Sequence, residues 1–279
     1  MPAQTITSRR EAAAERARTF SPFLRDAMSR RADVLEAFLL DGPQAAAGIA
    51  LKVVADTVEA ELRRQRVGVA LAAALGDLSG ELDLETVTAQ LSNFADSAID
   101  RAIETAISER SPGATPRGFA IIALGKLGSC ELNFSSDVDL LLLFDPETLP
   151  HRAREDSGEA AVRIGRRFVE LLQKRTEDGY VARVDLRLRP SPEVTPIALP
   201  VNAAISYYES SAVGWSALPS SALATVPVTR LWGSTSSPRS NRSSGAERST
   251  SGPSRKSAKW GRRSATIMRI ASSSARATM

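Results

Sequence analysis

The chain has 279 residues, of which 43% are hydrophobic, with 36 Lys and Arg against 32 Asp and Glu and a single Cys and a single His. That length is enough for one or two globular domains. One Cys and one His argue against a disulfide scaffold and a Cys/His zinc site. No segment reaches the roughly 18 consecutive apolar residues of a membrane-spanning helix, and the N-terminus has no apolar core behind its charges. We therefore expect a soluble cytoplasmic protein with no membrane partner.

Charge is unevenly distributed along the chain. Residues 216–279 hold 11 basic residues and one acidic residue, together with 17 serines. Residues 1–215 hold 25 basic and 31 acidic residues, so this part is acidic although the formal net charge of the chain is +4. The tail shows no sustained periodicity of strand or helix type. We therefore predict a disordered, basic, Ser/Arg-rich tail over 216–279 that is chemically unrelated to the rest.

Residues 1–110 are expected to form a helical region. The stretch from about Arg9 to Arg110 is rich in Ala, Leu, Glu and Arg and poor in Gly and Pro, which favours helices. Apolar residues recur three and four positions apart, as at Val34, Phe38, Leu51 and Val54. The predicted breaks between helices are Ser21-Pro22 and Asp41-Gly42-Pro43. We place no catalytic residue in this region.

Residues 111–215 are expected to form a domain with a mixed sheet. Apolar runs and alternation predict three strands, at 118–124, 138–144 and 180–188. A helix from Asp156 or Ser157 to about Thr176 is predicted between the second and third strands. Its apolar side would hold Ile164, Phe168, Leu171 and Leu172. Together with the helical region, these elements predict an α+β fold.

Acidic side chains at the strand ends are candidates for a metal site. Asp137 and Asp139 flank Val138 at the start of the second strand, so both leave the same face. At about 5 Å apart they would repel by about 3 kcal/mol at an effective dielectric near 20, so they need a cation or a raised pKa. Asp185 of the third strand is the candidate third carboxylate. Oxygen-only ligation predicts Mg²⁺ rather than zinc.

The segment before the second strand is a candidate phosphate-binding element. Residues 125–129 predict a small-residue turn in which Gly128 and Ser129 let a phosphate approach the backbone, although the spacing is not that of a P-loop. The cations predicted to neutralise charge on a transferred group are Lys126, Arg187 and Arg189. Cys130 has no nearby His, so we expect a small packed thiol rather than a nucleophile. Taken singly, each signal also fits a structural role, such as a solvated turn or a surface ion pair.

These residues carry a resemblance to a known family. The stretch Gly125–Leu140, GKLGSCELNFSSDVDL, resembles the signature of the glutamine synthetase adenylyltransferase/adenylyl-removing enzyme family. Segments Tyr180–Pro190 and Ser206–Ser210 resemble the family's following segments, whereas Ser129 stands where the family often has a second Gly. The resemblance spans most of 21–215 and implies a nucleotidyltransferase-like fold. It also implies metal-binding, catalytic carboxylates at Asp137, Asp139 and Asp185.

The resemblance implies a reaction and its partners. Family members carry two such catalytic domains, and these residues resemble the first, which removes AMP from a tyrosine of glutamine synthetase. The second, which adds AMP from ATP, is expected to be missing, so the catalytic domain over 111–215 is expected to be an incomplete part. The implied chemistry is Mg²⁺-dependent attack of inorganic phosphate on the adenylyl phosphorus, giving ADP and a free tyrosine hydroxyl. Implied partners are glutamine synthetase, ADP or ATP, phosphate and a PII-type signalling protein, in the regulation of nitrogen assimilation.

The tail has two interpretations. When residues 216–224 are written as possible codons with one added base and regrouped, they permit Glu-Arg-Ala-Ala-Phe-Ile-Arg-Ala-Arg, which is similar to the family at this place. We therefore hypothesise that the loss of a single base after Trp215 put 216–279 out of frame. The alternative is an evolved basic arm that binds RNA, DNA or acidic partners. We favour the frameshift over this nucleic-acid-binding arm. An inactive nucleotide-binding product and a nonfunctional truncated product remain open as alternatives to an active enzyme.

Overall fold

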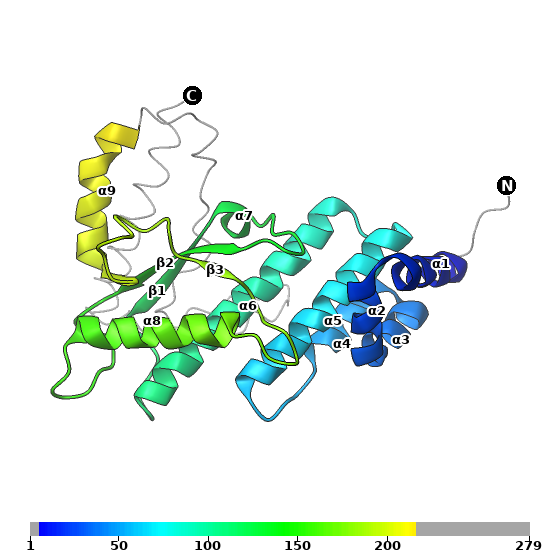
Figure 1. Ribbon diagram of the computed structural model, residues 1–279, viewed down its shortest axis with the longest axis horizontal. Helices are drawn as coiled ribbons and strands as arrows, with labels where there is room; N and C mark the ends of the chain where they lie inside the picture. Colours follow the sequence, from blue (N-terminus) through cyan, green and yellow to red (C-terminus); the bar gives the residue numbers. More distant parts are fainter. Residues whose placement is uncertain (1–5, 216–279) are drawn as a thin grey trace, which may run out of the picture.

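The computed structural model describes residues 6–215, which form a helical layer followed by a small sheet with helices on both faces (Figure 1). The helical layer consists of α1 (Ile6–Phe20), α2 (Pro22–Arg30), α3 (Ala32–Asp41), α4 (Pro43–Leu51), α5 (Val58–Ser79) and α6 (Leu84–Arg110). The sheet unit consists of β1 (Phe119–Leu124), α7 (Gly125–Gly128), β2 (Val138–Phe144), α8 (Ser157–Gln173), β3 (Val184–Asp185), β4 (Ala198–Pro200) and α9 (Val201–Trp215). The predicted α+β fold is confirmed. The predicted disordered tail, 216–279, lies outside the described residues.

The helices begin and end where the local sequence favours it. At α2 the Ser21 hydroxyl accepts a hydrogen bond from the Leu24 amide at 3.2 Å, and Pro22 occupies the first turn, where no amide hydrogen is needed. Pro43 opens α4 in the same way directly after Gly42. Both predicted breaks are therefore confirmed. At α8, Asp156 caps the helix by accepting from the amides of Gly158 and Glu159 at 2.9 and 3.1 Å.

The predicted apolar periodicity of the helical layer is right in part. Val34 and Phe38 are fully buried in α3, as expected. Leu51 and Val54 are instead 49% and 81% exposed. The reason is that α4 ends at Leu51, so Val54 lies in the connection to α5 and cannot continue the helical face.

The sheet is mixed, with β2 at its centre. β1 pairs with β2 in antiparallel fashion, and the short strands β3 and β4 both pair with β2 in parallel, β3 near its start and β4 near its end. The predicted bounds of β2, 138–144, are confirmed. β4 has no counterpart among the predicted strands. This topology brings the start of β2 next to β3 and to the end of β1, where Leu124 and Asp139 are register partners.

The third predicted strand, 180–188, is wrong in extent because only Val184–Asp185 pairs with β2. The amides of Val181 and Ala182 instead donate to the Leu172 carbonyl at 2.9 and 3.0 Å, so this segment closes the end of α8 rather than joining the sheet. On the other side, the Arg187 amide donates to the Asp185 carboxylate at 2.8 Å and turns the chain away.

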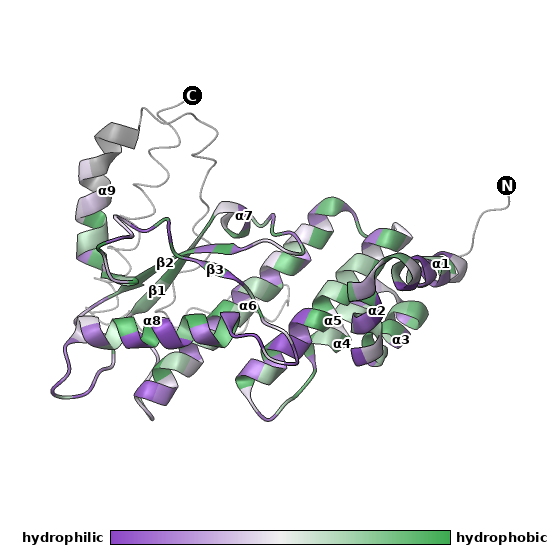
Figure 2. Ribbon diagram, in the orientation of Figure 1, coloured by the Kyte–Doolittle hydropathy of each residue, from purple (hydrophilic) through white to green (hydrophobic). Residues whose placement is uncertain are grey.

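Alternation along β2 divides its side chains between two apolar clusters. Leu140, Leu142 and Phe144 pack with α6 and α8, and the predicted apolar side of α8, at Ile164, Phe168, Leu171 and Leu172, is confirmed as buried. Leu141 and Leu143 pack on the other face with Ala204 of α9. Figure 2 shows both the apolar strands at the centre and the alternating polar and apolar sides of α8. The odd-numbered face of β2 is therefore the one that carries Asp139.

Ion pairs and hydrogen bonds fasten the helical layer to the sheet unit. Arg167 of α8 donates to Glu59 of α5 at 2.6 Å and to Glu109 of α6 at 2.7 Å. Arg63 of α5, 3% exposed, donates to the Lys174 carbonyl just after α8 at 2.9 Å. These contacts hold α5 beside the segment that follows α8. In the described part of the chain, no helix has both the length and the apolar character needed to cross a membrane.

Candidate active site

The predicted small-residue turn is one turn of helix, α7, between β1 and β2. The Ser129 amide and hydroxyl both donate to the Gly125 carbonyl, at 3.1 and 3.2 Å. Lys126 is exposed on this turn, and its Nζ donates to the Ser136 hydroxyl at 3.3 Å. Gly128 is buried in the same turn. The turn therefore places the Lys126 ammonium group over the loop that leads into β2.

Asp139 and Asp185 are brought together by the sheet. They are register partners in the parallel pairing of β2 and β3, so their side chains leave the same face of neighbouring strands. Gly125 leaves room for Asp139, since its φ is +56° and a Cβ added there would lie 2.6 Å from Asp139 Oδ2. A residue with a side chain at position 125 would be strained and would displace this carboxylate.

The electrostatics of the two carboxylates differ. Burial raises the pKa of Asp139, and the negative charges of Asp185 and Asp137 raise this pKa further. Hydrogen bonds from Arg187 lower the pKa of Asp185, because Arg187 Nε and Nη2 donate to its carboxylate at 2.8 and 2.5 Å. Among the residues that the structure describes, no cation contacts Asp139, and the neighbouring carboxylates Asp185 and Asp137 repel it.

Asp137 lies just before β2 and pairs with a different arginine. Arg183 Nε donates to Asp137 Oδ1, and Arg183 Nη2 donates to the Ser135 carbonyl at 2.5 Å. Within residues 6–215, no group of three or more His, Cys, Asp or Glu side chains is arranged to hold a metal ion. Asp139 and Asp185 are thus neighbours across two strands. Asp137 and Asp185 each form an ion pair with an arginine.

Arg189 lies in the loop after β3, and Cys130 lies on the turn after α7. Arg189 Nη1 and Nη2 donate to the carbonyls of Leu186 and Pro192, both at 2.7 Å, so this side chain organises the loop after β3. Cys130, expected to be packed, is instead exposed, at φ +59°, on the turn after α7. The positive φ turns its side chain away from the apolar interior that receives Leu127 and Leu132.

Arg183 is a site residue that sequence reasoning missed. Alternation over 181–187 puts Arg183 on the same face as Asp185, and that pattern is the available signal. Its pairing with Asp137 could not be inferred, because it depends on β3 lying parallel to the start of β2. The Val138 amide donates to the Arg183 carbonyl at 2.8 Å and fixes that arrangement.

Comparison with known proteins places this arrangement in a family. The model of the glutamate-ammonia ligase adenylyltransferase family matches residues 12–220. The chain belongs to this family. The match covers α1 from its second turn onward, the rest of the helical layer and the whole sheet unit with its acidic residues.

Curated relatives agree with the family match. A protein of Rhizobium meliloti is 39% identical over 222 residues, which cover 70% of this chain and 22% of the relative. A protein of Xanthobacter autotrophicus is 40% identical over 214 residues, with the same two shares. Both carry the name bifunctional glutamine synthetase adenylyltransferase/adenylyl-removing enzyme. The chain therefore spans less than a quarter of the length of the adenylyltransferase relatives that it matches.

Proposed function

We propose that residues 111–215 act as a nucleotidyltransferase unit that removes AMP from a tyrosine of glutamine synthetase by phosphorolysis. The observation that carries this proposal is the register pairing of Asp139 with Asp185 beside Gly125, in a chain of the adenylyltransferase family. The name of the relatives, which includes adenylyl-removing activity on glutamine synthetase, supports this choice of substrate.

The proposed reaction transfers an adenylyl group from a tyrosine oxygen to phosphate. An oxygen of inorganic phosphate forms a bond to the adenylyl phosphorus, and the bond from that phosphorus to the tyrosine oxygen breaks. The products are ADP and tyrosinate, which takes up a proton. Because the phenol pKa is near 10, tyrosinate leaves more readily than an alkoxide would. Lys126 and Arg187 are exposed cations next to the carboxylates and would stabilise the charge on the transferred group.

The carboxylates fit a hard divalent cation by their charge and donor type. Their ligand atoms are all oxygens, and the pKa of Asp139 is raised by burial and by the charges of Asp185 and Asp137, as expected of a set that needs a cation. We propose that Asp137, Asp139 and Asp185 would hold Mg²⁺. When bound, the ion would supply charge stabilisation at the phosphorus. Arg183 and Arg187 provide that positive charge to the carboxylates in this structure.

The test is release of ADP from AMP-modified glutamine synthetase. The full chain is incubated with this protein, inorganic phosphate and Mg²⁺, and ADP is measured over time. We expect ADP release that depends on phosphate, and a loss of about a hundredfold or more in Asp139→Asn. The matched control is Glu131→Gln, which removes an exposed carboxylate near the same turn and leaves Asp139 in place.

The outcomes separate this function from its alternatives. Phosphate-dependent ADP release by the wild type and by Glu131→Gln, but not by Asp139→Asn, supports the proposal. If a folded preparation binds ADP but releases none from the modified protein, the chain is a nucleotide-binding product without this activity. If a folded preparation neither binds ADP nor releases it from the modified protein, the proposal is wrong.

A further inference from the structure

Arg66 is a cation of the helical layer that the proposed reaction does not use. It lies on α5, half-buried, with its guanidinium carbon 4.6 Å from the centre of the Tyr180 ring. Arg63 and Arg64 on the same helix each have an oxygen partner, the Lys174 carbonyl and the Asp178 carboxylate. Among the described residues, the Arg66 guanidinium has no hydrogen bond and no ion pair, although burial lowers its pKa. Partial burial of a guanidinium without hydrogen-bond acceptors costs free energy, and an anion bound there would offset that cost.

A second guanidinium contacts the same tyrosine. Arg183 Nη1 lies 3.5 Å from the Tyr180 hydroxyl, while its other nitrogens bind Asp137 and the Ser135 carbonyl. The positive charge of Arg183 also lowers the pKa of Arg66, so the two guanidinium groups repel each other. Tyr180 therefore lies between an arginine without an acidic partner and an arginine attached to a proposed metal ligand.

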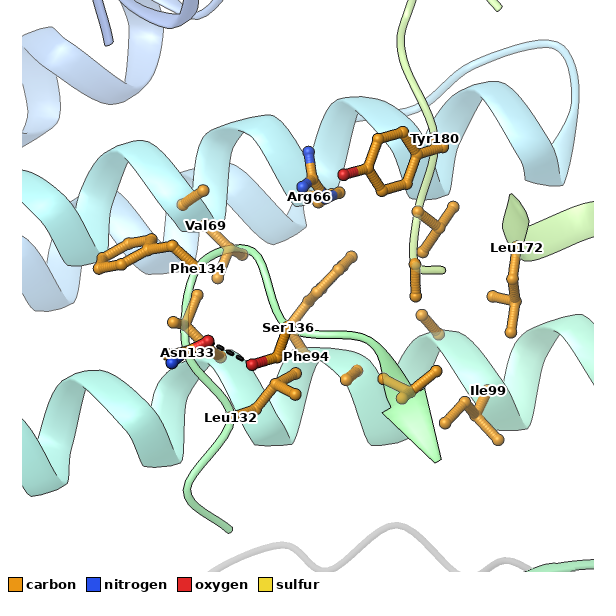
Figure 3. Close-up of a pocket in the computed structure, with 17 residues that line it drawn as sticks. Arg66, Val69, Phe94, Ile99, Leu132, Asn133, Phe134, Ser136, Leu172 and Tyr180 are labelled. Carbon is orange, nitrogen blue, oxygen red and sulfur yellow. Dashed lines mark hydrogen bonds between the residues drawn. The ribbon is translucent and has the colours of Figure 1, made fainter. Parts of the chain in front are cut away.

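Open space adjoins Arg66 on both sides. A small cavity of about 50 Å³, drawn in Figure 3, lies between α5, α6 and the loop before β2 and is lined mostly by apolar side chains. A larger groove of about 620 Å³ is also bordered by Arg66 and Tyr180, and by Ser135. The Ser135 hydroxyl is exposed and makes no hydrogen bond among the described residues. Arg66, Tyr180 and Ser135 thus offer polar hydrogens to this groove.

The other charges around the groove select a compact anion. Two of its four carboxylates are neutralised, because Asp26 pairs with Arg30 and Asp178 with Arg64. The remaining two, Asp77 and Glu177, also border the groove together with one further cation, Arg175, so a long acidic ligand that ran along it would meet two carboxylates and one guanidinium. A small anion at the Arg66 end gains the guanidinium contacts and avoids most of that repulsion.

We propose that Arg66, together with Arg183 and the Tyr180 and Ser135 hydroxyl groups, binds a phosphate-type oxyanion. Its chemistry is shared by inorganic phosphate and by the terminal phosphate of a nucleotide. The binding site stands without the proposed function, but its role as the site of the attacking phosphate rests on that function. Because Arg183 bonds to Asp137, an anion held by Arg183 lies close to one of the three proposed metal ligands, on the side of the helical layer.

The experiment is a calorimetric titration of inorganic phosphate into the full chain at constant ionic strength. We expect saturable binding that weakens about tenfold or more in Arg66→Gln, the effect of losing one charge-assisted contact. Arg66→Lys keeps the charge and is expected to recover part of the affinity. The matched control is Arg18→Gln, which removes an exposed arginine of the helical layer whose partner is Glu15; neither residue borders the groove, so the affinity is expected to stay unchanged.

A second variant keeps the test decisive if Arg66→Gln does not fold. Ser135 is exposed and its hydroxyl carries no internal hydrogen bond among the described residues, so Ser135→Ala is expected to fold normally and to weaken phosphate binding about threefold. If the wild type binds neither phosphate nor ADP, or if both Arg66→Lys and Ser135→Ala bind as tightly as the wild type, the proposed site is wrong.

Two further measurements identify the source of the anion and separate this site from the proposed function. The attacking phosphate would become the terminal phosphate of ADP, so phosphate and ADP should compete for the site and both should bind more weakly to Arg66→Gln. Simultaneous binding of the two would identify a site for free phosphate that lies outside the reaction. In the ADP-release assay, a higher KM for phosphate in Arg66→Gln with an unchanged KM for modified glutamine synthetase places the attacking phosphate at Arg66. If phosphate binding depends on Arg66 but the chain releases no ADP, the anion site is supported and only the proposed function is wrong.

Discussion

Asp139 and Asp185 are register partners across β2 and β3, and Arg187 donates to only one of them, Asp185. This relationship leaves Asp139 as a half-buried carboxylate that faces like charges. Such an arrangement weakens the fold locally and is commonly kept for a functional reason. The site is therefore expected to show opposite effects on stability and activity when Asp139 loses its charge.

Asp139→Asn is expected to be more stable than the wild type when divalent ions are removed by EDTA. The pKa of Asp139 is raised above its usual 3.8, so wild-type stability falls as the pH rises through that raised pKa, whereas the amide does not ionise. The gain is expected to be less than about 1 kcal/mol at pH 7.5, because the group is partly solvated, and to shrink towards pH 4. Thermal unfolding of both proteins at the two pH values measures it. A loss of stability in Asp139→Asn at pH 7.5 would show that the repulsion is not significant.

Gly125→Ala is expected to lower activity by more than backbone strain alone can explain. The new Cβ would lie 2.6 Å from Asp139 Oδ2, at a φ of +56°. Gly113→Ala is the matched control, because Gly113 also has a positive φ of +79° but a Cβ added there would meet no atom within 4 Å. Both changes should cost about 1 kcal/mol in the free energy of unfolding from strain. Only Gly125→Ala should reduce ADP release, by about tenfold or more; equal activity of the two variants would refute the contact with Asp139.

Glu155 is expected to make the attachment of α6 to α8 sensitive to acid. Burial alone would raise the pKa of Glu155, but hydrogen bonds from Arg110 and Arg163 lower it below 4.5. Its contribution to stability is therefore present above its unfolded pKa and is lost as the pH falls through the lowered pKa. Glu155→Gln should cost about 2 kcal/mol at pH 7, because its side chain is only 7% exposed.

The matched control for Glu155 is Glu159→Gln. Glu159 pairs with the same Arg163, but its side chain is 64% exposed. Its removal should change the free energy of unfolding by less than about 0.5 kcal/mol. Urea unfolding at pH 7 and pH 4 compares the two variants with the wild type. A cost for Glu155→Gln that does not shrink at the lower pH would mean that the ion pair is not its cause.

Arg187→Ala is expected to strengthen binding of Mg²⁺ and to weaken catalysis. Arg187 is 83% exposed and donates to the Asp185 carboxylate, so it competes with a cation for that group. Removing it should raise the affinity for Mg²⁺ by about threefold or more, while ADP release falls because charge on the transferred group is less well stabilised. Titration and the ADP assay on the same preparation measure both. An unchanged affinity would mean that Asp185 does not take part in binding the ion.

The tail hypothesis predicts a specific result at the level of the gene. Adding one base after the codon for Trp215 should restore a long reading frame that resembles the family. The nucleotide sequence across that codon decides the matter. If no correction by one base restores such a frame, the evolved basic arm is the better account of 216–279, and deletion of these residues should then abolish salt-dependent oligonucleotide binding.

Local sequence patterns predicted the elements whose cause is local. The bounds of β2 follow from its apolar run, and the helix starts at Pro22 and Pro43 follow from the preceding residues. The position of Asp139 at the edge of an apolar strand was readable in the same way, and its pairing with Asp185 was expected from their neighbouring strands.

Features that depend on distant partners were not predicted. Val181 and Ala182 could have extended β3, but their amides bond to the end of α8. The contact of Arg66 with Tyr180 joins α5 to a segment more than a hundred positions later, and no local pattern marks it. The pairing of Asp137 with Arg183 likewise depends on the parallel alignment of β2 and β3.

Titration of Mg²⁺ into the folded full chain, with and without ADP, measures whether Asp137, Asp139 and Asp185 bind the ion. We expect saturable uptake by the wild type and by Glu131→Gln, and a loss of about tenfold or more in affinity in Asp139→Asn. Uptake that is absent from the folded wild type, or that is the same in Asp139→Asn, would contradict the claim that these carboxylates hold the ion.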